Sequence, residues 1–163
     1  MKYYGRRSLS QVLKIILDIL LLLGAAYFIE TLYQAFILKD KLTSLELLSV
    51  FLLLIVGCSC VFIIVINIRA IMNSLVKENP FTRENVKALK RMSACSIVVA
   101  ICYIINLIIN FSSGQYKLIY IDKTGIHTDM EFLIFLFAGL FIYVLAKVFE
   151  NAVEVKEEND YTV

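Results

Sequence analysis

Long apolar runs separated by short polar segments dominate the sequence. Crossing a hydrocarbon layer about 30 Å thick takes roughly 20 helical residues. Four runs reach that length, near Val12–Leu38, Leu45–Met72, Leu89–Phe111 and Glu131–Glu150. The second run is the most apolar, with fifteen Leu, Ile, Val or Phe residues between Leu47 and Ile66. The pattern therefore predicts an all-α, four-transmembrane-helix bundle.

Composition supports a single membrane domain over residues 1–163. Hydrophobic residues make up 60% of the 163 residues and charged residues only 18%, which is too apolar for a soluble domain of this size. The polar remainder divides into a connector at 73–88, a second connector at 112–130 and a tail at 151–163. The surroundings expected for the chain are therefore a lipid bilayer.

Basic residues indicate how the chain is oriented. The polar segment Lys77–Arg91 has five basic and two acidic residues, a net charge of 5 − 2 = +3. With four spans, twelve Lys and Arg residues fall on the side of this segment and both termini, and four fall on the other side. Because short loops rich in Lys and Arg stay in the cytoplasm, we expect both termini to be cytoplasmic.

The polar segment also predicts where the third helix begins. It contains Pro80, the only proline of the chain, which cannot continue a helix from the preceding residues. The hydroxyl of Thr82 can accept a hydrogen bond from a free backbone N–H of a new helix. The sequence thus predicts that the third span is entered at Thr82.

A β-hairpin is expected in the connector 112–130, on the outer side of the membrane. Polar and apolar residues alternate there around the sequence Asp122-Lys123-Thr124-Gly125, in which Gly125 suits a left-handed turn position. The connector holds the only histidine, His127. A lone histidine is more often a solvated turn residue than a metal ligand, so no metal site is expected.

Polar residues inside the predicted spans are candidates for function. They are Asp18, Arg69, Asn106 and Asn110. Because an ionised side chain near the bilayer centre costs about 2.5–3.5 kcal/mol on insertion scales, such residues usually face a partner or a water-filled cleft. A structural pair of Asp18 with Arg69 or Lys147 is favoured over a role in moving ions or protons.

The tail continues the fourth helix in our interpretation. Phe149, Ala152, Val153 and Lys156 follow the spacing of one helix face. Residues 150–163 have five acidic residues and one Lys, a net charge of 1 − 5 = −4. An acidic tail and a basic connector on one side of the membrane are expected to touch. The alternative is two independently solvated charge runs, since exposed ion pairs contribute only about 0–1 kcal/mol.

The chain resembles a bacterial family of small four-span membrane proteins, domain-of-unknown-function family 2975. Two segments carry the resemblance: Asn79-Pro80-Phe81-Thr82-Arg83-Glu84-Asn85 with Leu89, and Val148-Phe149 followed by Glu154, Glu157, Glu158, Asp160, Thr162 and Val163. The resemblance implies a multi-pass protein of the bacterial cytoplasmic membrane. Members are often encoded beside a small helix-turn-helix regulator, which implies a transcription factor as the cytoplasmic partner.

A regulatory or interaction protein is the leading functional hypothesis. We find no phosphate-binding glycine loop, Ser/His/Asp set or metal-ligand cluster in the sequence, so we expect neither an enzyme nor a cofactor. A partner is expected to bind the connector and the tail, without direct contact between this chain and nucleic acid. The candidate residues are Pro80, Phe81, Arg83, Glu84, Asn85, Lys87, Glu154, Glu157, Glu158 and Asp160.

Other functional classes stay open at this point. In a small transporter, a channel-like homo-oligomer or a peptide-immunity protein, the intramembrane polar residues would line a cavity instead of pairing. An accessory subunit of a larger membrane complex is a further alternative, because small residues at Gly57–Cys60 and at Gly139 allow another helix to approach closely.

Overall fold

Four long helices make up most of the computed structural model, which describes residues 9–37, 44–111, 119–122, 125–128 and 130–161. The helices are α1 (Leu9–Ile37), α2 (Ser44–Val76), α3 (Arg83–Phe111) and α4 (Glu131–Tyr161). Each contains an 18-residue window with a mean hydropathy of 2.3 to 2.9. All four are thus long and apolar enough to cross a membrane, and the prediction of four such helices is confirmed.

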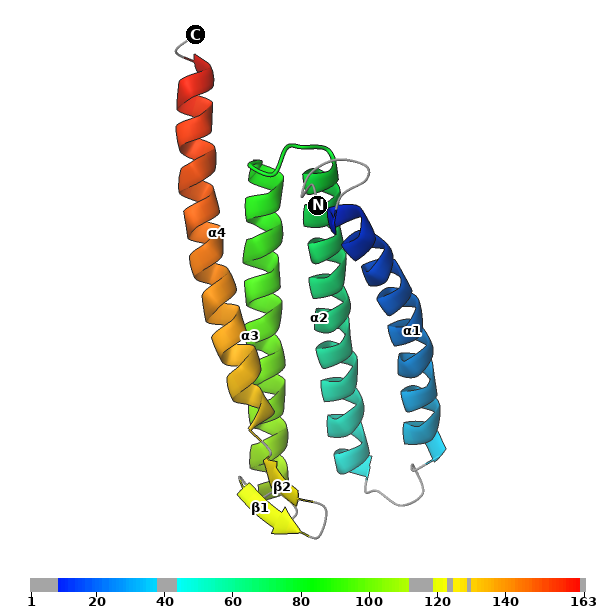
Figure 1. The fold of residues 1–163 in the computed structure, drawn as a ribbon. Coiled ribbons are helices and arrows are strands. Elements are labelled where there is room, and N and C mark those ends of the chain that lie inside the picture. Colours follow the sequence, from blue (N-terminus) through cyan, green and yellow to red (C-terminus); the bar gives the residue numbers. More distant parts are fainter. Residues whose placement is uncertain (1–8, 38–43, 112–118, 123–124, 129, 162–163) are drawn as a thin grey trace.

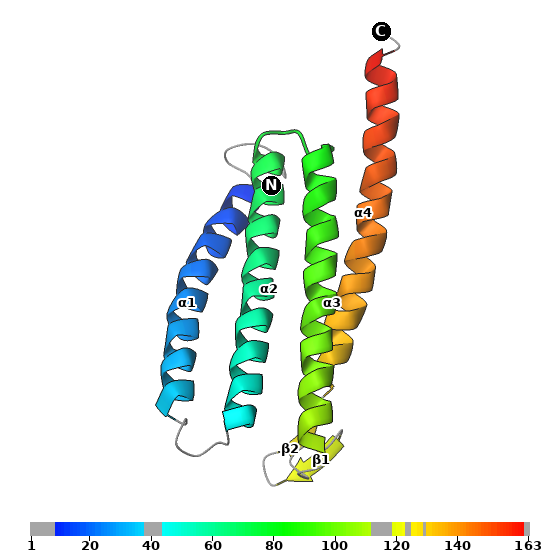
Figure 2. The ribbon, with the colours of Figure 1, turned by 180° about the vertical axis from the view of Figure 1, so that it is seen from behind.

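The helices pack in chain order as an open bundle. α1 contacts α2, α2 contacts α3, and α3 contacts α4, so α1 and α4 lie on the two outer sides (Figures 1 and 2). The linker 77–82 lies at the end of the bundle where α1 begins and α4 ends. Helix α3 is the most enclosed, with 28% of its apolar window buried against none for α1. The most buried residues of the bundle therefore lie along α3.

The contact between α3 and α4 is close because small residues line it. Ala100 and Ala146 are 1% and 0% exposed. The hydroxyl of Ser93 donates to the backbone oxygen of Gly139 at 2.8 Å, and that of Ser96 donates to the backbone oxygen of Phe135 at 2.8 Å. Small and hydroxyl-bearing residues are typical of helix contacts in membranes, where packing and hydrogen bonds replace the hydrophobic driving force.

Helix α2 ends in a left-handed residue. Glu78 has φ 59°, its N–H donates to the backbone oxygen of Leu75 at 3.1 Å, and the N–H of Asn79 donates to that of Ser74 at 3.1 Å. This pair of bonds is the Schellman motif, which uses carbonyls that a helix end leaves without a partner. Because α2 and α3 extend past the apolar runs, the linker is 77–82 and shorter than the predicted 73–88 connector.

Helix α3 begins at Arg83, as predicted from Thr82. The N–H of Asn85 donates to the hydroxyl of Thr82 at 3.3 Å and to its backbone oxygen at 3.1 Å. Glu84 lies in the first turn, where a negative charge is favourable for the helix dipole. Thr82 is therefore the N-cap residue of α3.

Two short strands lie between α3 and α4. Strand β1 (Ile119–Asp122) pairs antiparallel with β2 (Gly125–Thr128), with Ile119 opposite Thr128 and Asp122 opposite Gly125. The pair lies at the end of the bundle away from the linker (Figure 1). Its turn residues, 123 and 124, are outside the described part of the chain.

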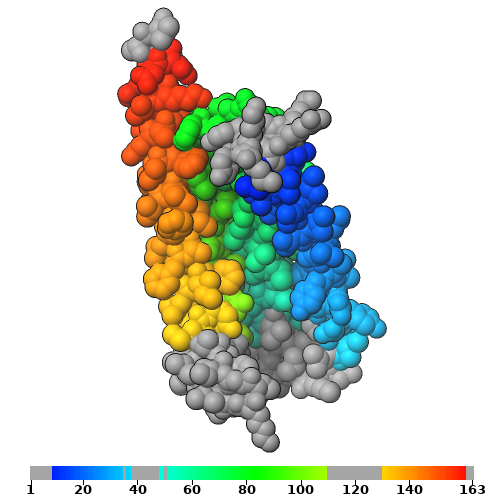
Figure 3. Space-filling view, viewed as in Figure 1, coloured from blue at the N-terminus to red at the C-terminus, as the bar shows by residue number. Residues whose placement is uncertain are grey.

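Helix α4 runs unbroken from the strand pair to Tyr161 and rises past the ends of α2 and α3 (Figures 1 and 3). The predicted continuation of the fourth helix into the tail is confirmed. Val153, on the predicted inner face, is 3% exposed. We refer to residues Glu150–Tyr161 as the stalk.

A methyl group added at Gly139 should weaken the α3–α4 contact. A Cβ atom there would lie 2.9 Å from Cγ1 of Ile97 and 3.3 Å from its backbone nitrogen. We expect Gly139→Ala to lower the free energy of unfolding in detergent by about 1–3 kcal/mol, the usual effect of overpacking. Gly57→Ala is the matched control, because its Cβ would meet nothing within 4 Å and both changes gain the same helix propensity. Equal stabilities of the two variants would contradict the close contact.

Glu78→Gly should stabilise the linker. A left-handed conformation costs an ordinary residue about 1–2 kcal/mol, whereas glycine adopts it freely but loses about 0.5–1 kcal/mol more backbone entropy on folding. The expected net gain in the free energy of unfolding is between zero and about 1.5 kcal/mol. In contrast, Glu84→Gly, inside the first turn of α3, should destabilise the protein. A loss of stability in Glu78→Gly would argue against the left-handed helix end.

Candidate functional site

The linker and the first turns of α3 contact the stalk, and we call this region the linker–stalk contact. Arg83, the first residue of α3, holds Glu157 in a two-pronged pair. Its Nε lies 3.0 Å from Oε1, and its Nη2 lies 2.5 Å from Oε2. Two parallel N–H···O bonds fix the orientation of both side chains as well as their distance. The pair therefore fixes which part of the stalk lies beside the first residue of α3.

Further polar contacts join the same elements. Lys90 of α3 donates to Glu150 at 2.6 Å, and Lys147 donates to the other oxygen of Glu150 at 2.9 Å. Halfway along the stalk, Lys156 donates to the side-chain oxygen of Asn79 at 3.0 Å. The basic segment and the acidic tail are thus in contact at several positions along the stalk, as predicted. The alternative, in which the two charged segments are solvated independently, is wrong for these residues.

Apolar groups support these polar contacts. The rings of Phe81 and Phe149 lie 5.6 Å apart between centroids, tilted by 38°. Val86 and Val153 are 5% and 3% exposed. Since exposed ion pairs alone contribute little, the aromatic pair and the buried valines supply much of the cohesion of the linker–stalk contact.

Asn85 has a structural position and does not face outward. It is 4% exposed, and its amide donates to the backbone oxygen of Pro80 at 2.6 Å and to the hydroxyl of Ser74 at 2.5 Å. These bonds join the end of α2, the linker and the start of α3. The prediction of Asn85 as a partner-binding residue is therefore not supported by its burial, since the sequence does not show which way a residue in the first turn of a helix points.

The other candidate residues divide by exposure. Phe81 is 43% exposed and Pro80 half-buried. The side chains of Arg83 and Glu157 are 58% and 42% exposed but occupied by each other. The exposed charged candidates beyond this pair are Glu84, Lys87, Glu154, Glu158 and Asp160. A partner would therefore meet mainly the acidic residues of the stalk, together with the first turns of α3.

The Arg83–Glu157 pair changes the acid–base properties of both groups. The hydrogen bond from Arg83 lowers the pKa of Glu157 below its ordinary value, and the hydrogen bond to Glu157 raises the pKa of Arg83. A carboxyl group whose pKa is lowered by folding stabilises the fold above its unfolded pKa, and that stabilisation is lost as the pH falls. The pair is hence fully formed at neutral pH and weakens in acid.

Asp18 and Arg69 form an ion pair between α1 and α2. Lys147, the other partner considered for Asp18, bonds Glu150 instead. The structural pairing of Asp18 is therefore present. A second polar contact between the same helices joins Lys14 to the side-chain oxygen of Asn73 at 3.0 Å.

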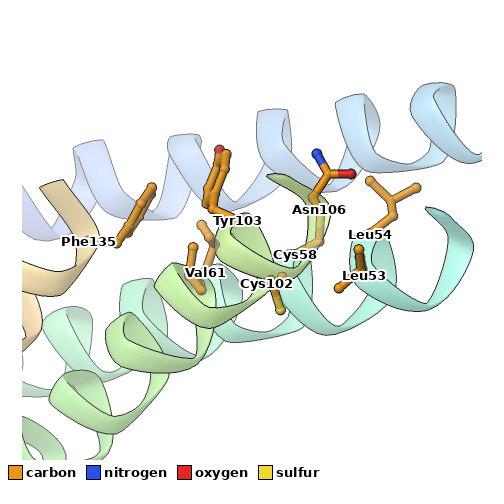
Figure 4. A pocket seen from close by; sticks show the side chains of 10 residues that line it. Leu53, Leu54, Cys58, Val61, Cys102, Tyr103, Asn106 and Phe135 are labelled. Atoms are coloured by element: carbon orange, nitrogen blue, oxygen red, sulfur yellow. The ribbon is translucent and has the colours of Figure 1, made fainter. Parts of the chain in front are cut away.

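Asn106 is far from the Asp18–Arg69 pair along the bundle and lines a cavity of about 340 Å³ between α2, α3 and α4 (Figure 4). Tyr103 and Phe135 stack at its edge with centroids 5.6 Å apart. A second cavity of about 240 Å³ lies between α1 and α2. The side chain of Asn110 is outside the described part of the structure. The two cavities were not predicted, because the sequence does not fix the spacing of the helices.

The small residues Gly57–Cys60 of α2 lie in two different surroundings. Cys60 is 9% exposed, whereas Gly57 and Cys58 line the cavity. Gly57 therefore has space beside it instead of a close neighbouring helix. In the described ranges, no group of three or more His, Cys, Asp and Glu residues could hold a metal ion.

Four long apolar helices, joined by short connections and braced by small-residue contacts, define a multi-pass helical membrane protein. The chain belongs to the protein family of unknown function DUF2975, whose family model matches residues 9–163. No curated protein and no solved structure matches the chain. Within the described residues, the two segments that carry the resemblance to this family meet at the linker–stalk contact.

Glu157→Gln should release the stalk. The substitution removes one charge of the Arg83 pair, so we expect faster hydrogen exchange of the amides at 150–161 at neutral pH. Lowering the pH of the wild-type protein below the ordinary pKa of glutamate, about 4.3, should progressively reduce the protection of the same amides, because the pKa of Glu157 in the folded protein lies below that ordinary value. Exchange is compared relative to the intrinsic rate at each pH. Asp160→Asn is the control, since it removes an equal charge one turn away. Equal effects of the two substitutions would exclude a specific role of the pair.

Proposed function

We propose that the protein is a membrane-anchored regulatory protein that holds a basic cytoplasmic partner on its stalk, in a bacterial cytoplasmic membrane with both termini inside. The observation that carries this proposal is the acidic stalk, a continuous helix that extends past the ends of α2 and α3 and is contacted by Arg83 and Phe81. Such a surface is preorganised, so a partner binds without the cost of ordering a flexible tail.

The charge of the stalk suggests the class of partner. Residues 150–163 have a net charge of −4, and Glu154 and Glu158 are one helical turn apart and exposed. A small helix-turn-helix regulator has a basic face for DNA phosphates. Complementary charge would speed its encounter with the stalk, and binding there would compete with DNA. Regulators of this class are those implied by the family resemblance.

The distribution of basic residues supports the proposed orientation. The linker and the first turns of α3 lie at the same end as the stalk and contain the Lys and Arg residues that favour the cytoplasm. Catalysis is not part of the proposal. Its basis is the exposed acidic surface of the stalk.

Transport is the less supported alternative. A polar path would require Asp18, Arg69 and Asn106 to line one continuous space. In the structure Asp18 and Arg69 bind each other, and neither residue lines the cavity between α2, α3 and α4 at which Asn106 lies. This arrangement favours a structural role for the ion pair.

The test is recruitment of a small helix-turn-helix regulator of the class that the family resemblance implies, as a fluorescent fusion in cells that produce the full-length protein. We expect Glu154→Gln/Glu158→Gln to lower the membrane-bound fraction, and wild-type binding to weaken as salt is raised in isolated membranes. The rate of association should fall more than the rate of dissociation rises, as for charges at the rim of an interface.

Glu30→Gln/Glu131→Gln is the matched control, because it removes two carboxylates from the opposite end of the bundle. It should recruit the regulator like the wild type, at equal protein levels. Unchanged recruitment in the stalk variant would overturn the proposal, as would an equal loss in the control.

A further inference from the structure

One face of α3 is turned away from the other helices along its whole length. Val98, Ile101, Ile105 and Ile108 are 36% to 66% exposed and follow a three- and four-residue spacing, so they form one stripe on the helix surface. In a membrane this stripe meets lipid chains. Toward the start of α3 the same spacing leads through Ala94 to Arg91 and Lys87, and all three are exposed. The lipid-facing stripe thus ends in two cations.

A small cavity adjoins the first of these cations. It measures about 110 Å³ and lies between α3 and the stalk. Its lining consists of Arg83, Val86, Lys87 and Lys90 from α3 and of Glu150 and Val153 from α4. Three cations and one carboxylate give this cavity a positive balance.

Two cations near the cavity are not part of its ion pairs. Arg83 is bound to Glu157, and Lys90 shares Glu150 with Lys147. Among the described residues, no ion pair joins Lys87 or Arg91 to a carboxylate. The carboxylate nearest in sequence on this side is Glu84, in the first turn of α3 and therefore farther from the apolar part of the helix.

We propose that Lys87, which lines this cavity, and Arg91, one turn farther along the exposed stripe, bind the phosphate of an anionic phospholipid whose chains lie along the stripe of α3. Basic pockets between transmembrane helices are suited to anionic headgroups. The apolar stripe directly below the cations distinguishes a lipid from a soluble anion, because it provides a surface for the chains. The proposal is independent of any protein partner of the stalk.

Native mass spectrometry of the full-length protein from mixed phosphatidylglycerol and phosphatidylcholine micelles tests this site. We expect the wild type to retain phosphatidylglycerol in preference to phosphatidylcholine. Lys87→Gln and Arg91→Gln should each weaken that retention about fivefold, the contribution of one cation near a charged lipid surface. Both residues are exposed, so the variants should keep the thermal stability of the wild type, which is measured in parallel.

Lys77→Gln is the control, because Lys77 is an exposed cation at the same end of the bundle but in the linker. It should retain phosphatidylglycerol like the wild type. Equal retention of the two lipids, or no change in both variants, would overturn the proposal. An equal loss in the control would indicate attraction by net charge alone, and displacement by excess inorganic phosphate would indicate a soluble-anion site. Either result would also overturn it.

Discussion

The close contact of α3 with α4 is the constraint on which the rest of the structure depends. Lipid chains are as apolar as leucine, so helices in a membrane associate through packing and hydrogen bonds. Gly139 lets the two backbones approach until the hydroxyl of Ser93 reaches the oxygen of Gly139. This contact fixes the line of α4, and the same line continues into the stalk. The position of the acidic residues outside the membrane is thus set by small residues within it.

The linker completes this arrangement from the other side. The end of α2, the linker and the start of α3 are joined by the amide of Asn85, which holds Phe81 and Arg83 where they meet Phe149 and Glu157. A flexible connector could not hold a charged helix at a defined height, because the ion pairs are exposed and individually weak. Because the hydrogen bonds of Asn85 hold the linker in place, several individually weak contacts together determine one position of the stalk.

Much of the architecture followed from the residues alone. The four apolar runs, the helix start at Thr82 and the continuation of the fourth helix depend on local composition and spacing, which are visible in a sequence. The pairing of Asp18 with Arg69 could be predicted because an isolated charge within a membrane requires a partner. The left-handed Glu78 and the inward amide of Asn85 were not predicted, because both depend on how two helix ends meet in space. The cavity beside Gly57 depends on the distance between helices.

The length of α4 has a consequence for the distance at which a bound protein would be held. Its 31 residues span about 46 Å at about 1.5 Å per residue, whereas the hydrocarbon layer is about 30 Å thick. The remainder, roughly 16 Å, is about two Debye lengths at physiological ionic strength, whereas the potential of the anionic leaflet falls off within about one. A basic protein held at the tip of the stalk would consequently be largely screened from the charge of the bilayer. Retention of such a protein would then depend on the carboxylates of the stalk and not on the membrane surface.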